Sequence, residues 1–137
     1  MKSAILLAFL LVSTKVIFAQ NVPYKVVFDL TSKDTNDHKT VLRWLKEISK
    51  GRPDAQMEVV LYGQSLDMVI KDKSIAKDAI QELMSNKNIF FKVCNASLTR
   101  HNIDKSTLLP GIAIVPDGIY EIITKQKEGW GYIKVAQ

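Results

Sequence analysis

The chain has 137 residues, with 19 lysines and arginines against 14 acidic side chains, and its formal net charge at pH 7 is +5. The basic residues alternate with acids, as in Lys71-Asp72-Lys73, whereas a nucleic-acid surface gathers them on one stripe. A nucleic-acid partner is therefore not expected. The single cysteine, Cys94, excludes an internal disulfide and a C-x-x-C dithiol.

The first 19 residues have the layout of a secretory signal peptide. Lys2 forms a short positive region, Ala4–Val12 is an unbroken apolar run, and Ala19 is a small residue at a plausible cleavage point. A membrane-spanning helix needs about 20 mostly apolar residues, and Lys15 interrupts the run before that length. We predict cleavage after Ala19, export to the periplasm, and no membrane attachment of residues 20–137, which form one domain.

The predicted elements of this domain alternate between strand and helix. The run Tyr24–Thr31 is rich in β-branched and aromatic side chains and favours a strand. Apolar residues then recur at helical spacing until Gly51 and Pro53, which are typical of a helix end. Further strands are expected at Met57–Tyr62, Ile89–Cys94, Ile112–Val115 and Tyr132–Val135, and helical segments at Leu66–Ile70, Ile75–Met84, Ala96–Asn102 and Ile119–Gln126.

This alternation predicts an α/β fold, a three-layer α/β/α sandwich with a mostly parallel sheet of about five strands. Helices are expected on both faces of the sheet. The continuous apolar runs of the first, second and fourth strands indicate strands that are buried on both faces. The pattern leaves the order of the strands open.

Candidate site residues follow the predicted strands, because open parallel sheets bind ligands at the carboxyl ends of their strands. Asp29, near the end of the first strand, is a candidate pocket acid, although a hydrogen bond to a neighbouring loop is its more common role. The remaining pocket candidates are Gly63 and Gln64 after the second strand, Asn95 after the third, and Pro116, Asp117 and Gly118 after the fourth.

Cys94 ends the third predicted strand, at the same edge. A lone cysteine is most often inert core, but the helix start behind it and the cationic residues Lys92, Arg100 and His101 are features that lower the pKa of a thiol. We therefore interpret Cys94 as a candidate reactive thiol. Taken singly, Lys92 and His101 are more typical of solvent-exposed side chains than of catalytic groups.

Cofactor and metal sites are not indicated by the sequence. The chain has neither a G-x-G-x-x-G nor a Walker motif, so no nucleotide is predicted. Its two histidines are far apart in sequence and its cysteine is single, which gives little support for a zinc site.

Five stretches of the chain resemble the DsrE/DsrF-like (YchN-like) family, in particular its exported bacterial members. They are YKVVFDLTS (24–32), EVVLYGQSLDMV (58–69), FKVCNASL (91–98), LLPGIAIVPDGIYEI (108–122) and KQKEGWGYIK (125–134). The resemblance implies a three-layer sandwich, assembly into a homo-oligomer, and sulfur carried as a persulfide on a cysteine at the end of the third strand. Cys94 occupies that position.

Sulfur handling through Cys94, as a persulfide carrier or a sulfurtransferase-like protein, is the expectation that follows. The alternative is a non-catalytic module of the same fold that binds a small ligand or serves in assembly. Reactivity of the thiol separates the two, and the sequence names neither a sulfur donor nor an acceptor. Trp130 and Tyr132, which follow the last predicted helix, either belong to an interface between copies of the chain or close over the domain's own last helix.

Overall fold

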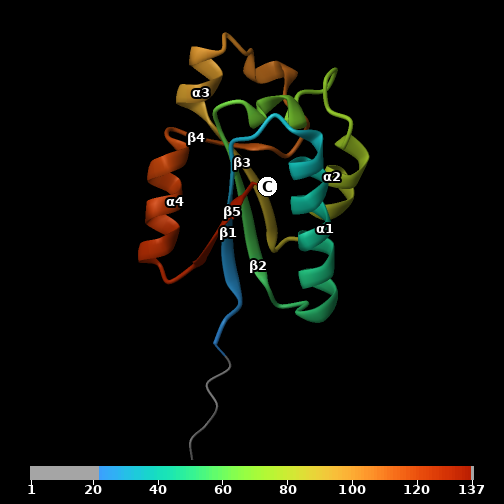
Figure 1. The fold of residues 1–137 in the computed structure, drawn as a ribbon, viewed down its shortest axis with the longest axis vertical. Helices are drawn as coiled ribbons and strands as arrows, with labels where there is room; N and C mark the ends of the chain where they lie inside the picture. Colours follow the sequence, from blue (N-terminus) through green and yellow to red (C-terminus); the bar gives the residue numbers. More distant parts are fainter. Residues whose placement is uncertain (1–21, 137) are drawn as a thin grey trace, which may run out of the picture.

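The computed structural model describes residues 22–136, so the predicted signal peptide at 1–19 lies outside it. None of the helices in this range is long and apolar enough to cross a membrane. Strands and helices alternate (Figure 1). The strands are β1 (Lys25–Leu30), β2 (Gln56–Leu61), β3 (Ile89–Cys94), β4 (Ala113–Val115) and β5 (Gly131–Val135). The helices are α1 (Thr35–Gly51), α2 (Lys77–Met84), α3 (Asn95–Arg100) and α4 (Gly118–Lys127), with 3₁₀ turns η1 (Ser65–Val69) and η2 (Lys105–Thr107).

The five strands are parallel, and their order across the sheet is β4-β3-β2-β1-β5. Parallel strands are joined almost always by right-handed crossovers, so the direction of travel decides which face a helix covers. From β1 to β4 the chain moves in one direction, which places α1 and α2 on one face. It then returns across the sheet to β5, and α4 covers the opposite face (Figure 1).

The two faces of the sheet bury different amounts of apolar surface. The main core lies beneath α1 and α2, with Phe28 and Phe91 among its largest fully buried side chains. Beneath α4 the buried apolar cluster consists of Val27, Val60 and Ile122. Apolar burial alone therefore attaches α4 less strongly than α1 and α2, and charged side chains take part in its docking.

Capping side chains explain where the two longer helices at the carboxyl edge begin. The Asp34 carboxylate accepts a hydrogen bond from the backbone N–H of Asn36 over 2.8 Å at the start of α1. Asp117 accepts one from the backbone N–H of Tyr120 over 3.0 Å at the start of α4. Each cap satisfies an N–H group that has no partner inside its helix. Both helices therefore start beside the ends of the strands.

The predicted three-layer α/β/α sandwich is confirmed, and its sheet is entirely parallel. The third strand has the predicted limits, and the other elements lie close to theirs. The expectation that the fourth strand is buried on both faces was wrong. β4 lies at the edge of the sheet, and Ala113 and Ile114 are exposed. An apolar run identifies a strand, but its place in the sheet depends on pairing partners that the run does not specify.

Candidate functional site

At the carboxyl ends of the neighbouring strands β3 and β4, the chain continues to opposite faces of the sheet. After β3 the chain runs to the face of α1 and α2, where Leu98 and Leu108 enter the main core. After β4 it turns into α4 on the other face. Ligands of open α/β sheets bind in the crevice at such a reversal. Cys94 ends β3 there, and the Ala96 N–H donates a hydrogen bond to the Pro116 carbonyl oxygen over 3.3 Å.

Cys94 lies in this crevice with very little of its surface exposed. It is the last residue of β3, it directly precedes α3, and it is 5% exposed. The start of α4 packs on it, since a Cβ added at Gly118 would lie 3.1 Å from the Cys94 Cβ and 3.4 Å from Cδ1 of Tyr62. In this conformation little of the thiol is accessible to a reagent.

Two other predicted residues of the crevice have different roles. The carboxylate of Asp117 is engaged in capping α4. The side-chain oxygen of Asn95, Oδ1, is buried without a hydrogen-bond partner in the described part of the chain. A buried acceptor without a donor is destabilising, so Asn95 lowers the stability of the crevice in this conformation.

The three cationic residues predicted to tune the thiol lie in three different surroundings. Lys92 shares a sheet face with the cysteine, but its ammonium nitrogen is 2.9 Å from Glu58 and 2.6 Å from Glu121. Its charge is therefore largely balanced by carboxylates. Arg100 is exposed at the end of α3, and His101 lines a separate cavity.

A network of charges joins α4 to the sheet, and sequence reasoning missed it. Glu58 on β2 is 1% exposed, and Lys92 on β3 connects it to Glu121 on α4. The Lys125 ammonium, also on α4, lies 4.0 Å from Glu58 and 3.9 Å from Glu121. The sequence signal that could have indicated this network was Glu58, a glutamate inside the apolar run of the second strand.

Burial and pairing move the pKa values of this network in different directions. Burial raises the pKa of Glu58 to about 7, although Lys92 partly offsets the effect. Burial alone would also raise the pKa of Glu121, but the hydrogen bond from Lys92 and the nearby charges outweigh it and lower that pKa. The pKa of Lys92 is raised because the two carboxylates outweigh its burial. Of the two carboxylates, Glu58 takes up a proton first as the pH falls.

A second polar cluster joins β5 to β1 on the same face of the sheet. The Asp29 carboxylate, in a residue only 5% exposed, accepts hydrogen bonds from the Tyr132 hydroxyl over 2.7 Å and the Lys134 ammonium over 3.0 Å. Lys134 also donates to the Thr31 hydroxyl over 2.8 Å, and its nitrogen lies 5.7 Å from the centre of the Tyr62 ring. The expected loop partner of Asp29 is thus replaced by side chains of β5, which the strand order brings beside β1.

The pKa values of two tyrosines beside Asp29 are raised. The hydrogen bond to Asp29 raises the pKa of Tyr132 to about 12. Burial, together with Asp29, raises the pKa of Tyr62 above its ordinary value. Tyr62 follows β2, which lies between the strands that carry Asp29 and Cys94. Its protonated hydroxyl is therefore a hydrogen-bond donor at this edge of the sheet.

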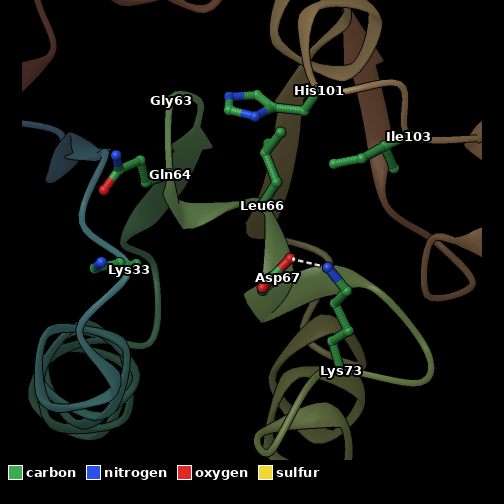
Figure 2. Close-up of a pocket in the computed structure, with 8 residues that line it drawn as sticks. All are labelled: Lys33, Gly63, Gln64, Leu66, Asp67, Lys73, His101 and Ile103. Carbon is green, nitrogen blue, oxygen red and sulfur yellow. Dashed lines mark hydrogen bonds and ion pairs between the residues drawn. The ribbon is translucent and has the colours of Figure 1, made fainter.

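A separate cavity of about 310 Å³ opens at the carboxyl edge, and it brings together the predicted residues Gly63 and Gln64 with His101 (Figure 2). Cys94 does not line this cavity. The single predicted pocket is therefore two places, a crevice around the thiol and a cavity beside it. The cavity is lined by Lys33, Gly63, Gln64, Leu66, Asp67, Lys73, His101 and Ile103.

The DsrE/DsrF-like family model matches residues 25–135 of the chain. The chain belongs to the DsrE/DsrF-like family. This match spans all five strands of the sheet and includes both the Cys94 crevice and the cavity. The family resemblance inferred from the sequence is confirmed, while export remains a prediction.

Solved structures share the DsrE/DsrF-like fold with this chain. The protein of unknown function MTH1491 from Methanobacterium thermoautotrophicum has 26% sequence identity and a TM-score of 0.76, and the match covers 81% of this chain and 98% of that chain. BT1422 from Bacteroides thetaiotaomicron has 18% identity and a TM-score of 0.66, with 81% and 94% covered. The ychN protein from E. coli has 11% identity and a TM-score of 0.67, with 82% and 98% covered. The last two likenesses show the fold alone, and no curated protein matched the chain.

Proposed function

We propose that this DsrE/DsrF-like protein handles sulfur, which it carries as a persulfide on Cys94. Membership of the family indicates a sulfur-related function. The observation that carries the finer proposal is the position of Cys94 at the carboxyl end of β3, where the chain reverses between α3 and α4. Cys94 is the single cysteine of the chain, so no other side chain can hold a persulfide.

The start of α4 lies against this cysteine. Gly118, the first residue of α4, packs directly on Cys94. The unpaired N–H groups at the start of a helix carry partial positive charge. At α4 the Asp117 carboxylate already accepts a hydrogen bond from one of these N–H groups, and sulfur transfer itself uses the thiolate, which is the nucleophilic form of a cysteine.

The proposed transfer starts from a small persulfide, R–S–SH. The Cys94 thiolate attacks the outer sulfur, the S–S bond of the donor breaks, and the donor leaves as the thiolate R–S⁻. One S–S bond is broken and one is formed, so no external oxidant or reductant is required. Because Cys94 is 5% exposed, the packing around the thiol has to loosen during the reaction.

Intact-mass spectrometry of the folded protein tests the proposal. After incubation with cysteine persulfide, we expect a mass increase of one sulfur atom, which reduction with a phosphine removes. The Cys94→Ser variant should remain folded, as judged by circular dichroism, and should show no adduct. Iodoacetamide should also label Cys94 in the native wild-type protein.

A different pattern would identify Cys94 as an inert core residue and favour the binding or assembly module. In that case the persulfide adduct is absent in the native state, iodoacetamide labels the thiol only after denaturation, and Cys94→Ser is strongly destabilised. Labelling of denatured protein with the same reagent serves as the positive control.

A further inference from the structure

The cavity beside the thiol crevice has walls from three separate segments. Lys33 comes from the connection between β1 and α1, Gly63 and Gln64 follow β2, and His101 follows α3. Figure 2 shows the His101 imidazole reaching across the top of the cavity toward Gly63. The walls thus bring together side chains that are distant in sequence around a volume of about 310 Å³, which is in the range of small-molecule sites.

The charges that line this cavity do not balance. The Lys73 ammonium and the Asp67 carboxylate pair with each other over 3.0 Å. Lys33 and His101 have no acidic side chain within ion-pair distance among residues 22–136. The cavity therefore has an excess of positive charge at Lys33, to which His101 adds when it is protonated.

The backbone N–H groups of Gly63 and Gln64 are already occupied, so side chains provide the donors along this wall. The Gly63 N–H donates to the Ser97 hydroxyl oxygen over 3.2 Å, and the Gln64 N–H donates to the Thr31 carbonyl oxygen over 3.1 Å. The cavity is therefore not a nest of backbone amides of the kind that holds phosphate. The Lys33 ammonium, the Gln64 amide and the His101 ring are the groups that can bind a charged ligand.

Part of the cavity wall is apolar. Leu66 and Ile103 line it, and Figure 2 shows Leu66 lying between His101 and the Asp67–Lys73 pair. We propose that this cavity binds a small organic anion, a carboxylate or sulfonate with a short apolar tail, held between Lys33 on one wall and His101 on another, with the tail against Leu66 and Ile103. This site does not depend on Cys94 carrying sulfur.

A pair of probes with the same tail and opposite charge tests this inference. Butyrate should shift the imidazole NMR signals of His101 saturably, while n-butylammonium at the same concentration and ionic strength should not. Butanol should bind more weakly than butyrate, since it lacks the charge. Signals are assigned by comparison with His101→Gln, which should remain folded because the ring is exposed.

Two variants place the anion within the cavity. Lys33→Gln and His101→Gln should each weaken butyrate binding by about fivefold. Binding to Lys33→Gln is followed by the His101 imidazole signals. Binding to His101→Gln is followed by the backbone amide signals of residues 63 and 64. Lys50→Gln, which removes an exposed lysine from the last turn of α1, should leave binding unchanged. Equal binding of the two butyl probes, no saturation with butyrate, or equal loss in all three variants would overturn the proposal.

Discussion

The Lys92 ammonium and the Glu58 carboxylate lie 2.9 Å apart between the sheet and α4, and Glu58 is almost completely withdrawn from solvent. Removing one partner from such a pair leaves an unpaired buried charge, which is far more destabilising than the loss of an exposed ion pair. The same ammonium holds Glu121 of α4, so this contact also determines how firmly α4 lies on the sheet.

Replacement of Lys92 by methionine should therefore lower the free energy of unfolding by about 3 kcal/mol near pH 8, because Glu58 must then either stay ionised without a partner or take up a proton. Urea denaturation measures the loss. The matched control is Lys46→Met, because Lys46 forms an exposed pair with Glu82 over 3.2 Å, and its loss should be below about 1 kcal/mol. Equal losses in the two variants would show that the buried pair has no special energetic role.

Glu58 also predicts a particular dependence of stability on pH. The pKa of an unperturbed glutamate is 4.5, and in the folded chain the pKa of Glu58 is about 7. Between these values the folded state retains a proton that the unfolded state has released. The free energy of unfolding should therefore fall as the pH rises through this window, by on the order of 3 kcal/mol for this group, and should level off above it.

Urea denaturation of wild type and Glu58→Gln at a series of pH values isolates this contribution. The stability difference between the two proteins should change between about pH 4.5 and pH 7 and be constant above that range. Glu82→Gln, at an exposed carboxylate, should instead follow the wild-type curve. The lowered pKa of Glu121 acts at more acid pH and does not obscure the window. A constant difference for Glu58→Gln throughout would contradict the prediction.

A methyl group at position 118 should destabilise the contact between α4 and the thiol crevice. The added Cβ of Gly118→Ala would lie 3.1 Å from the Cys94 Cβ and 3.2 Å from Cγ1 of Val60, so these neighbours have to give by a few tenths of an ångström. We expect a loss of about 1–3 kcal/mol in thermal or urea denaturation. At Gly51, near the end of α1, the added carbon meets no atom within 4 Å, and Gly51→Ala should be neutral or slightly stabilising. A neutral Gly118→Ala would show that α4 adjusts without strain.

Assembly into a homo-oligomer remains a prediction. The structure indicates that side chains other than Trp130 and Tyr132 are better suited to test it. Trp130 is partly buried against the cluster beneath α4, and the Tyr132 hydroxyl is bonded to a carboxylate on β1. Ile119 and Ile123 are one helical turn apart on α4 and exposed. Light scattering at micromolar concentration should give more than the monomer mass, and Ile119→Lys with Ile123→Lys should reduce it. Ile75→Lys, at an exposed position before α2, is the control, and a monomeric wild type would refute assembly.

Export is tested at the amino terminus. We expect the protein purified from its native host to begin at Gln20, because residues 1–19 have signal-peptide layout. Amino-terminal sequencing and fractionation of the periplasm provide the measurement. Replacement of Leu6 and Leu7 by arginine should keep the precursor in the cytoplasm, since it breaks the apolar run. A native protein that retains Met1 would overturn the prediction.

The alternation of strands and helices could be predicted because the signals are local. Ile89–Cys94 was identified with its observed limits, since an apolar run stops where Asn95 begins a helix. Placing Cys94 at the carboxyl edge of the sheet required only that run and the parallel arrangement.

The contacts that surround the thiol could not be predicted, because each joins elements distant in sequence. Glu58, Lys92 and Glu121 come from two strands and a helix, and they meet only in one strand order with α4 on one face. The donors to Asp29 come from β5, more than a hundred residues later. The burial of Cys94 likewise depends on how α4 begins at Gly118, a close approach that no local pattern encodes.

The pairing of β5 with β1 has a consequence for how this chain is made. The strand synthesised last among the five lies beside the strand synthesised first, with Gly131 opposite Val26. Until the ribosome has produced residues 131–135, β1 presents an open edge of unpaired backbone groups, and Asp29 has neither of its donors. A nascent or truncated chain that stops before residue 131 therefore exposes the unpaired edge of β1 and the Asp29 carboxylate without its donors. Such a chain is a target for chaperones and proteases.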